Sequence, residues 1–262
     1  MLKVRLDALL TRRGLFPSRS RAAASVMAGE VRVGPDRRRA DKPGQLVTPE
    51  LAVAVEAAPR YVSRGGVKLA NALAVSGLEA TGRSCLDVGA STGGFTDCLL
   101  QHGAAQVVAV DVGYGDLDWR LRNDPRVTVR ERVNARRLSP ASLPYRPDLI
   151  ALDVSFISVT KVLPAVLDCA AERYDCLALC KPQFEVGRRR VGGGGVVREA
   201  AHRREALLSV ARCAQGLGAA VLGFIPSGLP GAKGNLETFV WLGQAGRPGL
   251  WDLEAAAREA DP

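Results

Sequence analysis

The sequence predicts an α/β protein in which a mostly parallel, twisted sheet follows a small α+β domain. Beyond residue 63, short apolar runs alternate with helical stretches, and such alternation indicates a parallel sheet with helices on both faces. Before residue 58, two helical patterns precede short strands bounded by Gly and Pro turns. The expected sheet strands are residues 85–88, 107–110, 149–152, 177–179, 220–225 and 238–242.

The predicted organisation is a first domain over 1–58, a linker over 59–62 and a second domain over 63–262. In the first domain, Leu6, Leu9 and Leu10 recur at helical spacing.

The helix over 3–13 is followed by a second helix. Ser18 is a good N-cap for it, and Gly29 fits the left-handed position that ends a helix. Strands are expected at 31–33 and 51–55. In the second domain, Ser63 is the expected cap of a helix over 64–75.

The charge of the chain favours a polyanionic partner. The net charge is +9, and residues 1–60 contribute 12 Lys and Arg against 6 Asp and Glu. In the segment Ser18-Arg19-Ser20-Arg21, two arginines lie at a helix N-terminus, where backbone N–H groups already favour phosphate. The order of two helices, a strand over 31–33 and the Lys42-Pro43-Gly44 turn resembles the RNA-binding domain shared by a small-subunit ribosomal protein and RNA-modifying enzymes. The expected RNA-binding residues are Arg5, Arg19, Arg21, Lys42, Arg64, Arg136 and Arg188.

Several classes of protein are disfavoured. No run of ~18 apolar residues is present, so a membrane protein is not expected. Charges interrupt the first 14 residues, which disfavours a secretory signal and favours the cytoplasm. The six cysteines form no C-x-x-C pair, and the two histidines lack partners, so neither disulfides nor a metal site is expected.

A glycine-rich turn follows the first sheet strand of the second domain. It runs from Asp87 to Asp97, and Asp111 ends the next apolar run, 24 residues after Asp87. A dinucleotide fingerprint would need glycine at Ser91. A carboxylate at each strand end instead favours S-adenosylmethionine in a Rossmann-like methyltransferase, with Asp111 on the ribose hydroxyls. The expected cofactor-binding residues are Asp87, Gly89, Ser91, Thr92, Gly93, Gly94, Phe95, Asp111 and Asn134.

Alternatives to this cofactor site stay open. The turn could be a structural strand-to-helix connection or an NAD site, although Ser91 disfavours NAD. Asn134 could be an ordinary capping residue.

Four ionisable residues stand where strands or helices meet loops. Asp153 and Lys181 each follow an apolar run, and ligands of open α/β sheets bind outside the carboxyl ends of strands. Glu237 directly precedes the expected strand over 238–242, and Lys68 lies on the helix before the first sheet strand. Each has an ordinary interpretation by itself, since a lysine on a helix is usually a solvated surface charge.

Six strings carry a family resemblance across nearly the whole chain: YVSRGGVKL, LDVGASTGGFTD, DVGYG, LDVSFIS, KPQFEVG and GNLETF. In this order, behind the basic module, they resemble the TlyA family of ribosomal RNA 2′-O-methyltransferases. The second domain is similar to the wider FtsJ-like group, whose catalytic tetrad corresponds to Lys68, Asp153, Lys181 and Glu237.

The resemblance implies S-adenosylmethionine as cofactor and ribosomal RNA within ribosomal subunits as partner. No obligate protein partner is evident from the sequence. The implied target is a cytidine 2′-hydroxyl of the large subunit, and in longer members also one of the small subunit. An apolar pattern over 250–260 resembles the longer members.

The tetrad suits the chemistry of a ribose hydroxyl, which is a poor nucleophile that must be aligned and must lose a proton. Lys181 is the best candidate to contact that hydroxyl. Like charge from Lys68 would favour neutral Lys181, whereas Asp153 and Glu237 would favour its charged form. Lys181 is therefore either a general base or a charged positioner beside a water that takes the proton.

Rival functions are weighed against this one. They are a non-enzymatic RNA-binding protein with a methyltransferase-like fold, a membrane-lytic haemolysin, as some family members are labelled, and methylation of another polynucleotide or of a base atom. The intact tetrad disfavours the first, the absence of apolar spans disfavours the second, and the lack of an Asn-Pro-Pro-Tyr-type motif disfavours base methylation. The basic segment over 187–195 is a candidate RNA clamp or a plain mobile linker.

Overall fold

A computed structural model describes residues 3–56, 60–231 and 233–261 of the chain. The chain divides into two compact units, residues 1–60 and 61–262. Part of the predicted linker, residue 59, lies outside the described residues.

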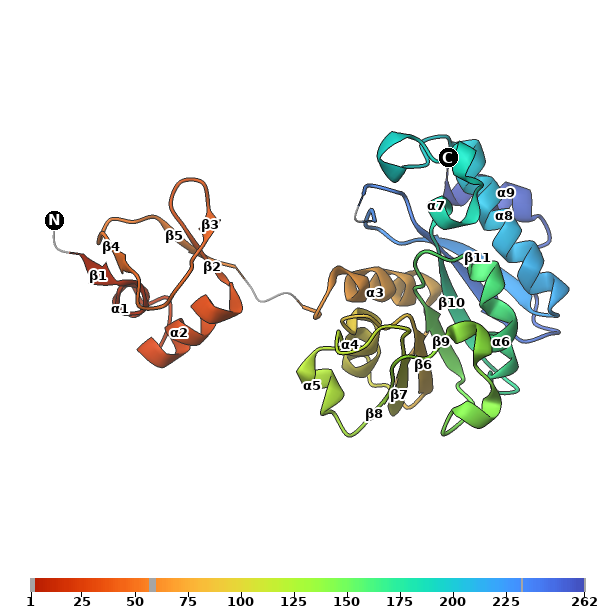
Figure 1. Ribbon diagram of the computed structural model, residues 1–262, viewed down its shortest axis with the longest axis horizontal. Coiled ribbons are helices and arrows are strands. Elements are labelled where there is room, and N and C mark those ends of the chain that lie inside the picture. The colour runs from red at the N-terminus through yellow and green to blue at the C-terminus, as the bar shows by residue number, and fades with distance from the viewer. Residues whose placement is uncertain (1–2, 57–59, 232, 262) are drawn as a thin grey trace. The chain divides into compact units, whose positions relative to one another are not determined.

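The first unit is a small α+β module built on a core of its own. Its elements are β1 (Val4–Arg5), α1 (Leu6–Arg12), α2 (Arg19–Ala28), β2 (Val31–Val33), β3 (Arg38–Arg39), β4 (Leu46–Val47) and β5 (Val53–Val55) (Figure 1). Strand β1 pairs with β4, and β2 lies between β3 and β5 in an antiparallel sheet. The two helices meet through Leu6, Leu10, Ala22 and Val26.

The caps of α2 confirm the sequence prediction. Ser18 Oγ accepts the N–H of Arg21 at 3.2 Å, and Gly29 adopts φ 80° after the helix. The predicted first helix begins later than expected, because Leu6 N–H donates to Gln45 and Asp7 N–H donates to Pro43. These distant partners hold Val4 and Arg5 as a short strand.

The second unit contains a seven-stranded sheet in the order β11-β12-β10-β9-β6-β7-β8. All of its strands are parallel except β12, which runs antiparallel to both of its neighbours. The strands are β6 (Ser84–Val88), β7 (Gln106–Val110), β8 (Val127–Arg130), β9 (Leu149–Leu152), β10 (Asp175–Cys180), β11 (Ala220–Pro226) and β12 (Thr238–Gly243). The predicted mostly parallel α/β fold is confirmed, and the six predicted runs are all strands.

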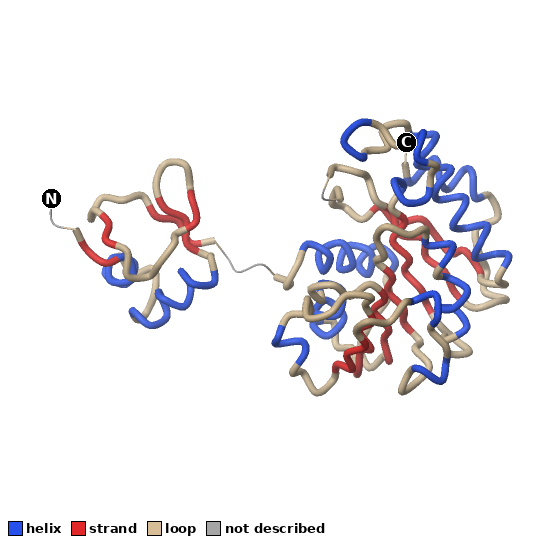
Figure 2. Tube along the Cα trace, viewed as in Figure 1, coloured by secondary structure: helices blue, strands red, loops and turns tan. Residues whose placement is uncertain are grey.

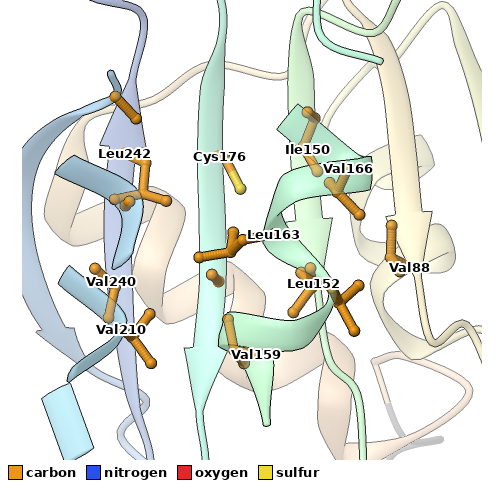
Figure 3. Packing of buried hydrophobic residues seen from close by; sticks show 14 of the residues in the cluster. Val88, Ile150, Leu152, Val159, Leu163, Val166, Cys176, Val210, Val240 and Leu242 are labelled. Carbon is orange, nitrogen blue, oxygen red and sulfur yellow. The ribbon is translucent and has the colours of Figure 1, made fainter. Parts of the chain in front are cut away.

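Helices cover both faces of this sheet (Figure 2). One face packs against α3 (Arg64–Ser76), α4 (Gly94–Gln101) and α5 (Trp119–Arg122), and the other against α6 (Leu163–Asp168), α8 (Ala200–Gly216) and α9 (Leu253–Ala260). The strand side chains alternate between the faces, as the two-residue period of a strand requires. In β9, Ile150 and Leu152 pack in the core with α6 and α8 (Figure 3). Leu149 and Ala151 face the other core.

Short helices complete the second unit. They are α7 (Pro182–Glu185) and the 3-10 turns Ala135–Arg137, Pro140–Ser142, Val159–Lys161, Arg188–Arg190 and Gly193–Gly195. Among the residues that the structure describes, no helix combines the length and the apolar composition needed to cross a membrane.

The buried carboxylate of Asp87 ties β6 to α4. Asp87 is fully buried, and its Oδ2 accepts both the N–H of Thr96 at 2.9 Å and its hydroxyl at 2.7 Å. Burial raises the pKa of Asp87 to about 7, and the negative charges of Asp153 and Asp111 add to the effect. The carboxyl group is therefore easier to bury when it is protonated.

We expect Asp87→Asn to change the pH dependence of stability. Because the folded-state pKa is raised above its ordinary value of 3.8, the stabilising contribution of the wild-type carboxyl is fully present below that value and is lost as pH rises through about 7. The free energy of unfolding of the wild type should thus fall, relative to that of Asp87→Asn, between these two pH values. Urea denaturation across this range measures it, and a constant difference between the two proteins would contradict the prediction.

Candidate active site

The glycine turn after β6 is shaped by steric limits that only glycine satisfies. Gly89 and Gly93 have φ of 87° and 95°. A Cβ at Gly89 would lie 2.5 Å from the carbonyl oxygen of Asp153, and one at Gly93 would lie 2.3 Å from Leu121. Ser91 also adopts a positive φ, 48°, which is uncommon for a residue with a side chain. The turn therefore passes close to the end of β9 on one side and to α5 on the other.

Asp111, directly after β7, fastens this turn. Its two carboxylate oxygens accept the N–H groups of Ser91 and Gly113, each at 2.7 Å. An ionised carboxylate has about four acceptor sites, so two backbone bonds leave capacity for ligand hydroxyls. The half-buried carboxylate lines a cavity.

Two adjoining cavities lie at the carboxyl ends of the strands. One measures about 480 Å³ and the other about 350 Å³, sizes within the usual range of small-molecule sites. Gly89, Ser91 and Asp153 line both of them. The two cavities meet beyond the carboxyl ends of the neighbouring strands β6 and β9. This is the switch point of the sheet, because the chain runs outward from β6 to β7 and β8 before it returns at β9.

The predicted cofactor residues distribute around these cavities. Asp111 and Asn134 line the larger one, and Thr92, Gly94 and Phe95 line the smaller one. Asn134 also caps the following turn, since its side chain accepts the N–H of Arg136 at 3.1 Å. Both interpretations of Asn134 are thus compatible with its position.

Asp87 and Gly93 occupy a different position. Asp87 and Gly93 are not among the described residues that line the two cavities. Asp87 holds α4 through Thr96, and Gly93 packs under Leu117 and Leu121. Both support the turn from behind.

The four predicted catalytic residues form two ion pairs. Lys68 pairs with Glu237, and the two side chains are only 8% and 3% exposed. Lys181 Nζ lies 2.5 Å from Asp153 Oδ1. Lys68 and Asp153 line the smaller cavity together, so the two pairs flank one space.

Strand register explains how residues so distant in sequence meet. Cys180 of β10 pairs with Thr238 of β12, so Lys181, after β10, emerges beside Glu237, before β12. Asp153 extends β9, and its N–H donates to Val88 of β6 at 2.8 Å. Because β12 is antiparallel, its first residue lies at the same sheet edge as the last residues of β9 and β10.

Three further residues belong to the site, and none of them was predicted from the sequence. Ser155 Oγ accepts a hydrogen bond from Lys181 Nζ at 2.8 Å. Phe156 has a φ of 65°, is 92% exposed and lines the larger cavity. Gly231 packs against Glu237, because a Cβ there would lie 2.3 Å from its carboxylate. The string LDVSFIS contains Ser155 and Phe156, but only its aspartate, Asp153, was predicted to belong to the site.

The loop after β9 is joined to α7 by a second carboxylate, which is half-buried. Glu185 accepts the hydroxyl of Ser158 at 2.5 Å and the N–H of Val159 at 2.8 Å. Burial raises its pKa. This contact braces the segment that presents Asp153 and Ser155 to Lys181.

The predicted RNA-binding residues separate into two groups in the first unit. Arg5 and Arg19 both contact the buried carboxylate of Asp7, at 2.6 and 3.3 Å. The hydrogen bond from Arg5 lowers the pKa of Asp7. Arg21 and Lys42 are exposed. One carboxylate therefore orients two arginines, one of them on the first turn of α2, and about half of each side chain remains exposed.

In the second unit, Arg64 lines the smaller cavity and Arg136 the larger one, and both are exposed. The side chain of Arg188 lies outside what the structure describes. RNA binding by these residues thus remains a prediction.

Family models match both units. Residues 61–244 match the FtsJ-like methyltransferase family, and residues 4–53 match the S4 domain. The methyltransferase match includes all four residues of the two ion pairs and both cavities.

Whole-chain relatives extend these matches. The chain is 51% identical over 242 residues to the Mycobacterium tuberculosis protein named 16S/23S rRNA (cytidine-2′-O)-methyltransferase TlyA, covering 92% of this chain and 90% of that protein. It is 37% identical to Hemolysin A of Brachyspira hyodysenteriae, covering 89% and 97%. A solved structure of a hemolysin-named protein from Streptococcus thermophilus is 39% identical, with a TM-score of 0.74 and coverage of 99% and 96%.

The resemblance inferred from the six strings is therefore confirmed: the chain belongs to the TlyA family, in which an S4 domain precedes an FtsJ-like methyltransferase domain.

Proposed function

We propose that this protein transfers a methyl group from S-adenosylmethionine to the 2′-hydroxyl of a cytidine in ribosomal RNA. The main observation in support is that two ion pairs, Lys68–Glu237 and Lys181–Asp153, lie beside two adjoining cavities. The name of the M. tuberculosis relative supports the cytidine, the ribose position and both ribosomal subunits as targets. Such a substrate implies action in the cytoplasm, on ribosomal subunits.

The cavities suit S-adenosylmethionine. Asp111 offers free acceptor sites for a ribose diol, and Asn134 lies in the same wall. The glycine turn lines both cavities, so its backbone would lie close to a ligand that occupies them. When bound, the cofactor supplies an electrophilic methyl group on a sulfonium.

The side chains of the tetrad would act on the RNA. Lys181 is held by Asp153 and Ser155, so its ammonium has a fixed position from which to hold the 2′-oxygen. On methylation, the hydroxyl would lose its proton to neutral Lys181, or to water beside charged Lys181. The electron pair of the broken carbon–sulfur bond would leave with the thioether. Lys68 and Glu237 neutralise each other in a nearly buried place, which keeps the neighbouring charge balanced.

The S4 module supports RNA as the partner. Asp7 orients Arg5 and Arg19, and such oriented arginines are suited to phosphate oxygens. The hemolysin names of two relatives favour a membrane-lytic alternative. Liposome leakage by the purified protein would distinguish that alternative.

The proposed function is tested by incubating the purified protein with labelled S-adenosylmethionine and isolated ribosomal subunits that lack the modification. We expect label on a 2′-oxygen of a cytidine, located by mapping 2′-O-methyl groups. Label on a base atom, or none on either subunit, would contradict the proposal.

Lys181→Ala should lower single-turnover methyl transfer by more than about 100-fold, because the hydroxyl loses both its positioning group and its candidate base. Affinity for S-adenosylmethionine should stay within about three-fold, as calorimetry can show. Lys161→Ala, at an exposed lysine that belongs to neither ion pair, is the matched control. A turnover rate equal to that of wild type would remove Lys181 from the mechanism.

Gly93→Val should weaken cofactor binding by more than about 10-fold, because a side chain there meets Leu121 and Leu117 and strains a residue with φ of 95°. Calorimetry measures the affinity. The control is Gly246→Val, which imposes a similar backbone strain at φ 80° in open space. Equal affinity of Gly93→Val and wild type would refute the role of this turn.

A further inference from the structure

Asn235 is a buried amide whose hydrogen bonds join two loops of the second unit. The side chain is 1% exposed. Its Oδ1 accepts the N–H of Val197 at 2.9 Å, and its Nδ2 donates to the carbonyl of Gly195 at 2.8 Å. Every hydrogen-bonding atom that faces the neighbouring loop is thus paired, as burial of an amide requires.

The first loop, residues 187–197, is here called the glycine loop. It carries the basic segment proposed as an RNA clamp, and Gly194 and Gly195 both adopt φ of 82°. Arg190 forms an ion pair with Glu205, which anchors this segment to α8. Asn235 anchors the other end of the loop, where the chain returns from the glycines.

The second loop, of which the structure describes residues 231 and 233–237, is here called the Glu237 turn. Gly231 N–H donates to the carbonyl of Asn235 at 2.8 Å and closes the turn. Gly231 also packs so closely against the Glu237 carboxylate that no side chain would fit at this position, because a Cβ would lie 2.3 Å from Oε1. A shift of the turn would therefore change the contact between its backbone and the carboxylate that pairs with Lys68.

We infer that Asn235 is a positioning residue that couples the glycine loop to the Lys68–Glu237 pair. The contacts run without a gap from Gly195 to the Asn235 amide, to Gly231, and to the Glu237 carboxylate. Binding of RNA phosphates to the glycine loop would order this path and fix the carboxylate. This inference rests on the proposed function, and it assigns the loop a role in turnover in addition to affinity.

The test is Asn235→Asp, which keeps the acceptor for Val197 but sets a carboxylate oxygen against the Gly195 carbonyl. We expect kcat on ribosomal subunits to fall about 10- to 100-fold, since small misplacements of a catalytic group have effects of this size. The KM for subunits and the Kd for S-adenosylmethionine should stay within about three-fold. Leu236→Ala is the matched control, because Leu236 lies in the same turn and is 53% exposed.

Two results would overturn the inference: a kcat of Asn235→Asp within two-fold of wild type, or a loss that disappears at saturating subunits. If this variant fails a thermal-melting check, Gly195→Ala disturbs the same contact from the other loop and should lower kcat likewise. An unchanged kcat for Gly195→Ala would also refute the coupling.

Hydrogen exchange supplies a readout that does not depend on activity. In Asn235→Asp, amides of the glycine loop and of the Glu237 turn should lose protection together. Loss in one loop alone would contradict the coupling. Wild-type protein that methylates no subunit would instead contradict the proposed function, so the two failures can be told apart.

Discussion

The antiparallel pairing of β12 with β10 is the constraint on which the site depends. Cys180 opposite Thr238 fixes the register, and that register sets Lys181 beside Glu237 at one edge of the sheet. A slip of one residue would turn the side chains of β12 to the opposite face and would bury or expose the wrong set. The ring centroid of Phe239, the second residue of β12, lies 5.9 Å from that of Phe95. This contact in the adjacent core shows how packing enforces the register. The hydrophobic effect thus sets the position of the ionic groups.

A second constraint brings the two cavities to the same edge. The chain leaves β6 in one direction and returns at β9 on its other side, so the glycine turn and Asp153 face each other across the switch point. The contact between Gly89 and the carbonyl of Asp153 joins the loop expected to hold the cofactor to the loop that holds the candidate catalytic carboxylate. The candidate cofactor site and the candidate catalytic site therefore share a wall.

Local signals predicted much of the fold. Ser18 and Gly29 define α2 because capping depends on a few neighbouring residues, and the apolar runs of the second domain predicted strands because both faces of a parallel sheet are buried. Strand β8 was missed because its half-buried edge position leaves a weaker apolar pattern. The pairing of Lys68 with Glu237 joins residues 169 positions apart, and Asn235 gains its partners only when two loops meet. Strand order and loop packing decide such contacts, and neither is written in local spacing.

The central claim is that the two ion pairs act as one catalytic unit set by the β10–β12 register. The most direct test is single-turnover methyl transfer by Asp153→Asn, by Glu237→Gln and by the double variant. If the pairs act together, the double variant should lose at least about 10-fold less than the product of the two single losses, because the second change disturbs a unit already broken. Losses that multiply would show that the pairs act independently, and would contradict the claim.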